Sequence, residues 1–255
     1  MSAGTISKRQ FPTNSAGRSP ATWLVHALGS TVGNKYLVAL TAWALTGFVL
    51  VHMSGNLLIF KGRDALNSYA LFLKDRGSLL WLARGGLLAV FVIHIWLTVR
   101  LKLRNRAARP VAYAYEQTIQ ASWASRHMLL TGLVILAFVV FHLMHYTFGL
   151  VAATAPSGMN FLKLEDPARH HDVYAMTVYG FRNVWVSVAY IVAQLFLGLH
   201  LSHGVSSTFQ SLGLAAPRYW PAIRVFGLAL TAAVVIGNVS MPLAVLFRFV
   251  GTDIG

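Results

Sequence analysis

The sequence predicts an all-α integral membrane protein, a bundle of five transmembrane helices. Only 11% of the 255 residues are charged, whereas a soluble globular domain carries about 25%. Five long apolar runs are separated by short loops. None of these runs alternates apolar and polar residues, as the strands of a membrane barrel would. Helices are therefore expected, because a chain in hydrocarbon must satisfy its backbone hydrogen bonds internally.

Each predicted span contains the roughly 20 largely apolar residues that a membrane-crossing helix needs. The first span, 35–60, reads KYLVALTAWALTGFVLVHMSGNLLIF. The second, 79–101, reads LLWLARGGLLAVFVIHIWLTVRL. The third, 127–150, reads HMLLTGLVILAFVVFHLMHYTFGL. The last two, 182–206 and 221–247, read RNVWVSVAYIVAQLFLGLHLSHGVS and PAIRVFGLALTAAVVIGNVSMPLAVLF.

The distribution of basic residues predicts the orientation. The N-terminal arm through Lys35, the second loop (100–126) and the fourth loop (207–220, with Arg224) carry 12 of the 21 basic residues and one of the seven acidic residues. Basic loops stay in the cytoplasm, so residues 1–34 are expected to form a cytoplasmic arm before a membrane domain at 35–255. We expect a multi-pass protein of the inner (plasma) membrane. Its apolar surface should contact lipid, and its net charge of +14 reflects these loops rather than nucleic-acid binding.

The chain contains no cysteine, which excludes disulfides and any iron–sulfur cluster held by this chain alone.

Histidines are the ionisable residues that stand out within the spans. Apart from His127 at the start of the third span, the spans contain six histidines and neither Asp nor Glu, and these histidines are His52, His94, His142, His145, His200 and His203. Ionisable side chains inside a membrane usually face the bundle interior and mark a functional site. Neutral imidazoles without carboxylates are typical of metal or haem ligands rather than of a proton pump.

Depth sorts the buried histidines into two layers. His52 and His142 fall in the outer half of their helices, and His94 and His203 fall in the inner half. The layers are about ten residues apart, or roughly 15 Å, a spacing that suits two haems with two axial histidines each. His145 and His200 share a helix face with His142 and His203, so spacing leaves them open as alternative ligands or as partners of a propionate or quinone. The competing interpretation is that these histidines only pack across helices.

Four motifs, each on its own span, resemble the single-subunit, five-helix cytochrome b anchor of succinate:quinone oxidoreductases, which include succinate dehydrogenase and fumarate reductase. They are HMSGNLLIF with the downstream NSYA, VIHIWLTVR, TGLVILAFVVFHLMHYTFG and GLHLSHGVSSTFQSLG. The resemblance implies an inner haem b held by His94 and His203 and an outer haem b held by His52 and His142. It also implies a flavoprotein subunit and an iron–sulfur subunit docked on the cytoplasmic face. Electrons would pass from succinate to menaquinone or ubiquinone, and the complex could form a higher oligomer.

Polar residues near the span ends are further candidates for pairing haem propionates or binding quinone through charge-assisted hydrogen bonds. At the inner edge these are Lys35, Arg126 and His127, with Ser30 and Trp123 as a possible quinone pocket. At the outer edge they are Arg84, Arg182, Lys61 and Tyr69.

Three alternatives stay open from the sequence. The chain could anchor another respiratory dehydrogenase, such as a hydrogenase or formate dehydrogenase. It could hold one haem, or share a Rieske-type cluster with a partner that supplies the cysteines. It could also be a non-redox bundle with packed histidines.

Overall fold

In the computed structural model the described residues are Thr22, His26, 28–108 and 122–254. Most of the expected arm at 1–34, and residues 109–121 of the second loop, lie outside this part of the chain. The prediction of an all-α membrane bundle is confirmed. The described residues contain no strand and five helices long and apolar enough to cross a membrane.

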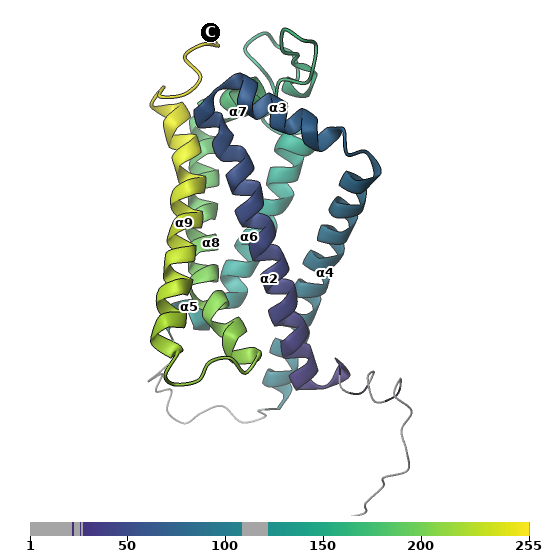
Figure 1. Cartoon of the computed structure of the whole chain (residues 1–255), viewed down its shortest axis with the longest axis vertical. Coiled ribbons are helices and arrows are strands. Elements are labelled where there is room, and N and C mark those ends of the chain that lie inside the picture. The colour runs from purple at the N-terminus through teal and green to yellow at the C-terminus, as the bar shows by residue number, and fades with distance from the viewer. Residues whose placement is uncertain (1–21, 23–25, 27, 109–121, 255) are drawn as a thin grey trace, which may run out of the picture.

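The five long helices run alternately up and down (Figure 1). They are α2 (Thr31–Asn56), α4 (Ser78–Ala107), α6 (Met128–His142), α8 (Val184–Ser211) and α9 (Trp220–Leu246). α2 continues as a 3-10 turn, η1 (Leu57–Lys61), and α6 continues as a π-helical turn, η2 (Leu143–Thr147). Short helices connect them: α3 (Arg63–Lys74), α5 (Trp123–Arg126), η3 (Phe161–Lys163) and α7 (Val173–Arg182).

Local capping explains where two of these helices begin. α2 starts at Thr31, ahead of the predicted 35, because the Ser30 hydroxyl accepts a hydrogen bond from the Gly33 N–H at 3.0 Å. α8 starts at Val184 because the Asn183 side chain accepts from the Trp185 N–H at 3.0 Å. Asn183 separates α8 from α7, so the region before the fourth span is a helix of its own.

The helices pack unequally. α8 lies at the centre and contacts α2, α6 and α9. α4 stands at one edge of the bundle and packs mainly on α2 (Figure 1). Leu97 is its only buried residue. A helix so little covered by protein leaves most of its apolar surface to lipid.

The two ends of the bundle differ. One end carries α3, α7 and the C-terminal segment (Figure 1), and we call it the lid end. At the opposite end α4 finishes with Arg100, Lys102, Arg104 and Arg106, and we call it the basic end. The largest buried apolar cluster lies toward the lid end and includes Ile59, Tyr174, Val178 and Tyr190.

Candidate functional site

A layer of histidines and threonines lies in the half of the bundle nearer the basic end. Thr41 Oγ1 on α2 lies 3.0 Å from His94 Nδ1 on α4, and Thr131 Oγ1 on α6 lies 3.0 Å from His200 Nδ1 on α8. We call these two pairs the basic-side layer; one pair joins α2 to α4 and the other joins α6 to α8.

The threonine hydroxyls fix which nitrogen of each histidine carries the proton. A hydroxyl has one proton, and Thr41 donates its proton to the Leu37 carbonyl oxygen at 2.8 Å. Thr131 donates to the Met128 carbonyl oxygen at 3.1 Å. With that proton donated to the carbonyl oxygen, we assign each threonine oxygen as the acceptor of the facing Nδ1–H. Assigned in this way, His94 and His200 both keep a free Nε2 lone pair, which is the form that binds a metal.

A second layer lies in the half nearer the lid end. The imidazole rings of His52 on α2 and His142 on α6 make an edge contact, with centroids 5.8 Å apart and planes at 86°. The Tyr190 hydroxyl on α8 lies 3.1 Å from His142 Nδ1 and 3.0 Å from His145 Nδ1. In this lid-side layer, too, a hydroxyl from a neighbouring helix holds a histidine through Nδ1.

Three helices give the same separation between the layers. His52 follows Thr41 by 11 residues on α2, and His142 follows Thr131 by 11 on α6. Tyr190 precedes His200 by ten on α8. At 1.5 Å per residue these intervals correspond to roughly 15–17 Å.

His145 differs from His142 in its surroundings. It lies in η2 directly after α6 and has no exposed surface. Phe141, Tyr146 and Phe161 surround its ring, and its Nε2 atom has no hydrogen-bond partner. The lid-side histidine that contacts His52 is thus His142, and His145 lies enclosed behind it.

The donor set fits haem better than a bare metal ion. Within the described ranges there is no group of three or more His, Asp or Glu side chains that could hold an ion. The histidines come in pairs, so a metal bound here must bring its remaining ligands, as haem iron does. Two imidazoles on opposite sides of one metal have centroids about 6 Å apart, because each metal–nitrogen bond is about 2 Å. The distance of 5.8 Å between the His52 and His142 centroids is close to this separation.

The glycines of the long helices divide into two groups. A Cβ at Gly55 or Gly198 would collide with Tyr69 or Val235, so these two glycines serve ordinary helix packing. A Cβ at Gly47, Gly85 or Gly86 would meet no atom within 4 Å. Protein packing does not require glycine at these three positions.

The residues predicted at the inner edge lie at the basic end. The Trp123 and His127 rings stack with centroids 4.1 Å apart, and His127 Nδ1 lies 2.8 Å from the Trp123 carbonyl oxygen. Lys35 and Arg126 are exposed. Ser30 caps α2.

The residues predicted at the outer edge have different roles. Arg182 donates to the carbonyl oxygen of Gly251 at 2.8 Å and to that of Ile254, which ties it to the C-terminal segment. Arg84 is exposed over the Trp81 ring, and Lys61 is exposed at the end of η1.

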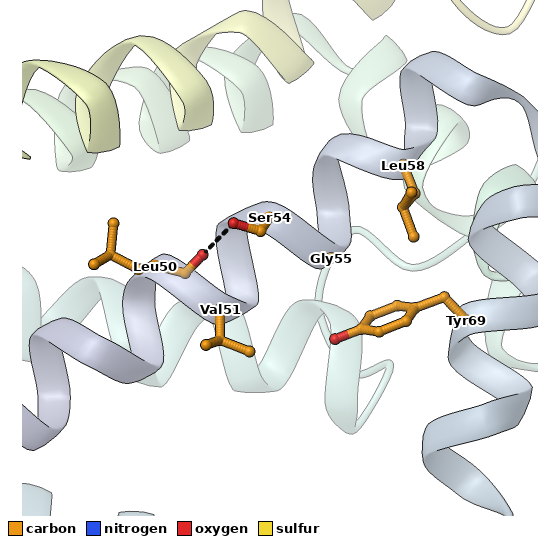
Figure 2. Close-up of a pocket in the computed structure, with 6 residues that line it drawn as sticks. All are labelled: Leu50, Val51, Ser54, Gly55, Leu58 and Tyr69. Carbon is orange, nitrogen blue, oxygen red and sulfur yellow. Dashed lines mark hydrogen bonds between the residues drawn. The ribbon is translucent and has the colours of Figure 1, made fainter.

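Tyr69 lines a shallow apolar cavity of about 360 Å³, largely open to the surroundings, on the lid-end half of α2. Figure 2 shows its phenol reaching from α3 toward Gly55 and Val51. The other polar side chain in the lining, Ser54, donates to the Leu50 carbonyl oxygen at 2.8 Å. The Tyr69 hydroxyl is thus the polar group that this cavity offers to a ligand. The cavity is lined by Leu50, Val51, Ser54, Gly55, Leu58 and Tyr69.

An ion pair between the partly exposed Arg63 and the buried Asp172 fastens the start of α3 to the start of α7 at the lid end. Arg63 Nε donates to Asp172 Oδ2 at 2.8 Å, and Asn67 Nδ2 donates to Asp172 Oδ1 at 3.0 Å. Burial by itself raises the pKa of Asp172. The hydrogen bonds from Arg63, the Ala175 N–H and Asn67 outweigh that effect and hold the pKa below its ordinary value. The Asn67 of the NSYA motif therefore has a structural partner in this chain.

Sequence reasoning missed the hydroxyls that orient the histidines, namely those of Thr41, Thr131 and Tyr190. The available signal was their position ten or eleven residues along the helix from a histidine of the other layer. That interval predicts a hydroxyl at the same depth as a histidine on a neighbouring helix. It does not predict that the hydroxyl points toward that histidine.

Comparisons with protein-family models, with curated proteins and with solved structures find no match for this chain. The site therefore rests on its own geometry.

Proposed function

We propose that this chain is the membrane-anchor subunit of a succinate:quinone oxidoreductase, which binds two haems b and passes electrons to quinone. The observation that carries the proposal is the pair of histidine layers. In each layer histidines from different helices converge, and a hydroxyl holds at least one of them through Nδ1. Four motifs of the chain resemble such anchors.

In this proposal His52 and His142 would hold the lid-side haem, and His94 and His203 would hold the basic-side haem. A bound haem would supply one-electron chemistry, and the protein would tune its potential through these histidines, their hydrogen bonds and their burial. Thr41 holds His94 in the orientation and tautomer that a ligand needs.

The two ends of the bundle would bind different partners, the soluble subunits at the basic end and quinone toward the lid end. The basic end of α4 would face the cytoplasm and attract the flavoprotein and iron–sulfur subunits. The cavity beside Tyr69 has the volume for a quinone ring, with the phenol as a hydrogen-bond donor to a quinone oxygen. Menaquinone and ubiquinone share that carbonyl chemistry. The proposed location is the inner membrane.

The first test is a dithionite-reduced minus oxidised absorbance spectrum of the purified chain, with haem b quantified per polypeptide. Two haems per chain are expected. A purified, folded chain without haem would overturn the proposal. Copurifying subunits identify the complex, since a covalent flavin supports this function and a nickel or molybdenum centre supports a hydrogenase or formate dehydrogenase anchor.

Single replacements then assign the basic-side ligand. The motif resemblance points to His203, whereas the Thr131 hydrogen bond prepares His200. We expect His203→Ala to reduce the haem content from two to one and His200→Ala to leave it at two. The reverse result would assign the iron to His200.

A further inference from the structure

The lid-side layer contains one hydroxyl shared by two histidines, which a simple ligand site does not need. The Tyr190 hydroxyl is within hydrogen-bond distance of His142 Nδ1 at 3.1 Å and of His145 Nδ1 at 3.0 Å. Tyr190 is itself only 6% exposed. A phenol has one proton to donate. Both contacts are satisfied when Tyr190 donates to one histidine and accepts from the other, so the two histidines hold opposite tautomers.

The proposed role of His142 decides which histidine has which tautomer. Iron binds a ring nitrogen that carries no proton, so a His142 that ligates through Nε2 carries its proton on Nδ1. His142 Nδ1–H then donates to the Tyr190 oxygen, and the Tyr190 O–H donates to His145 Nδ1.

We propose that Tyr190 is a positioning residue that, with His145 behind it, fixes the tautomer and orientation of His142. The hydrogen bonds then run in one direction: His142 Nδ1–H donates to the Tyr190 oxygen, and the Tyr190 O–H donates to His145 Nδ1. His142 is left with a free Nε2 lone pair, and His145 carries its proton on Nε2.

This arrangement has an electronic consequence for the proposed lid-side haem, so this part of the inference rests on the proposed function. A histidine that donates its Nδ1–H to an acceptor is a more basic ligand. The Tyr190 oxygen is a stronger acceptor because its own O–H is donated onward to His145. A more basic ligand favours the oxidised iron, and it therefore lowers the potential of that haem.

The test is Tyr190→Phe in the full chain, with the midpoint potentials of both haems measured by redox titration. We expect two haems to remain, the lid-side potential to rise and the basic-side potential to stay unchanged. A tenfold change in the preference of the site for oxidised iron corresponds to about 59 mV for one electron. Unchanged potentials, or equal shifts of both haems, would overturn the inference.

His145→Phe is the second variant. It keeps an aromatic ring among Phe141, Tyr146 and Phe161, and it removes the acceptor for the Tyr190 O–H. A smaller rise of the same potential is expected. Loss of the lid-side haem from this variant would show that His145 is a ligand and would overturn the inference.

Nitrogen NMR of ¹⁵N-histidine-labelled protein separates this inference from the proposed function. It should show His142 protonated at Nδ1 and His145 protonated at Nε2, with or without haem. If the wild-type chain binds no haem, the proposed function fails, and the NMR spectrum still decides the hydrogen-bond chain. The opposite tautomers would overturn it.

Discussion

Individual hydroxyl groups decide how the histidines of this bundle are presented. A histidine in a membrane span can pack, bond or ligate, and its tautomer decides which. Thr41 and Thr131 each donate to a carbonyl of their own helix, so we assign their oxygens as acceptors for the neighbouring imidazoles. This assignment leaves the Nε2 atoms of His94 and His200 free. It depends on two individual threonine side chains and not on the apolar pattern that defines the helices.

Thr41→Val should weaken the basic-side site while leaving the fold intact. The change removes the acceptor for His94 Nδ1–H and keeps the shape of the side chain. Loss of such a supporting partner typically costs about 10- to 100-fold in metal affinity. The effect is measured by diluting the protein and recording how much haem it retains in the reduced-minus-oxidised spectrum. Thr46→Val is the matched control, since the buried Thr46 bonds only the Ala42 carbonyl oxygen of its own helix. An equal loss of haem from both variants would contradict the role given to Thr41.

Helices α2 and α3 meet through a glycine, and this contact shapes the cavity beside Tyr69. A Cβ at Gly55 would overlap the Tyr69 ring, so the ring must move when any side chain is added. Gly55→Ala should therefore close or reshape the cavity and destabilise the protein by about 1–3 kcal/mol, as overpacking does. Thermal unfolding in detergent measures the destabilisation, and quinone binding reports on the cavity.

Gly47→Ala on the same helix is the control for Gly55→Ala. Nothing lies within 4 Å of the added methyl group, and alanine is the better helix former. We expect unchanged or slightly higher stability, and a Tm loss as large as that of Gly55→Ala would argue against the packing explanation.

The fastening of α3 to α7 should depend on pH. Asp172 has a lowered pKa in the folded protein, so its ion pair contributes full stability above the ordinary carboxyl pKa of about 3.9. That contribution is lost as the pH falls through the lowered value. Asp172→Asn should remove this contribution at neutral pH and lower the free energy of unfolding by about 2–3 kcal/mol. Breaking a fully buried ion pair costs about 3–5 kcal/mol. The expected loss is smaller here because Arg63 is 31% exposed.

Unfolding followed between pH 3 and pH 7 tests this expectation. The wild-type Tm should approach that of Asp172→Asn at the acidic end, because protonation makes the two proteins alike. A constant difference in Tm over the whole range would contradict it.

The whole molecule has two chemically different ends, and their sidedness can be measured directly. The natural chain has no cysteine, so single cysteines can be introduced without removing others. Ala168→Cys at the lid end should react with a membrane-impermeant maleimide in intact cells. Ala108→Cys at the basic end should react only after the membrane is opened.

Leu88→Cys is the control inside the bilayer. Leu88 is 61% exposed on α4, yet it lies within the span, so a thiol there should face lipid and react poorly. The reverse pattern for Ala168 and Ala108 would invert the orientation predicted from the basic loops.

The five-helix fold class was predictable from the amino-acid sequence. A run of about 20 apolar residues reveals a spanning helix. Inside lipid the side chains must be apolar and the backbone must satisfy its own hydrogen bonds. The two histidine depths were also expected from counting residues along regular helices. Sequence resemblance supplied the choice of His203 over His200, which remains a prediction.

Helix ends and facing partners required the three-dimensional arrangement. The break at Asn183, the π-helical turn after His142 and the Arg63–Asp172 pair depend on which segments meet at the lid end. Residue spacing gives the depth of a side chain but not the rotation of its helix against the next. The sharing of Tyr190 by His142 and His145 follows from that rotation, because a hydrogen bond needs its two atoms within about 3 Å.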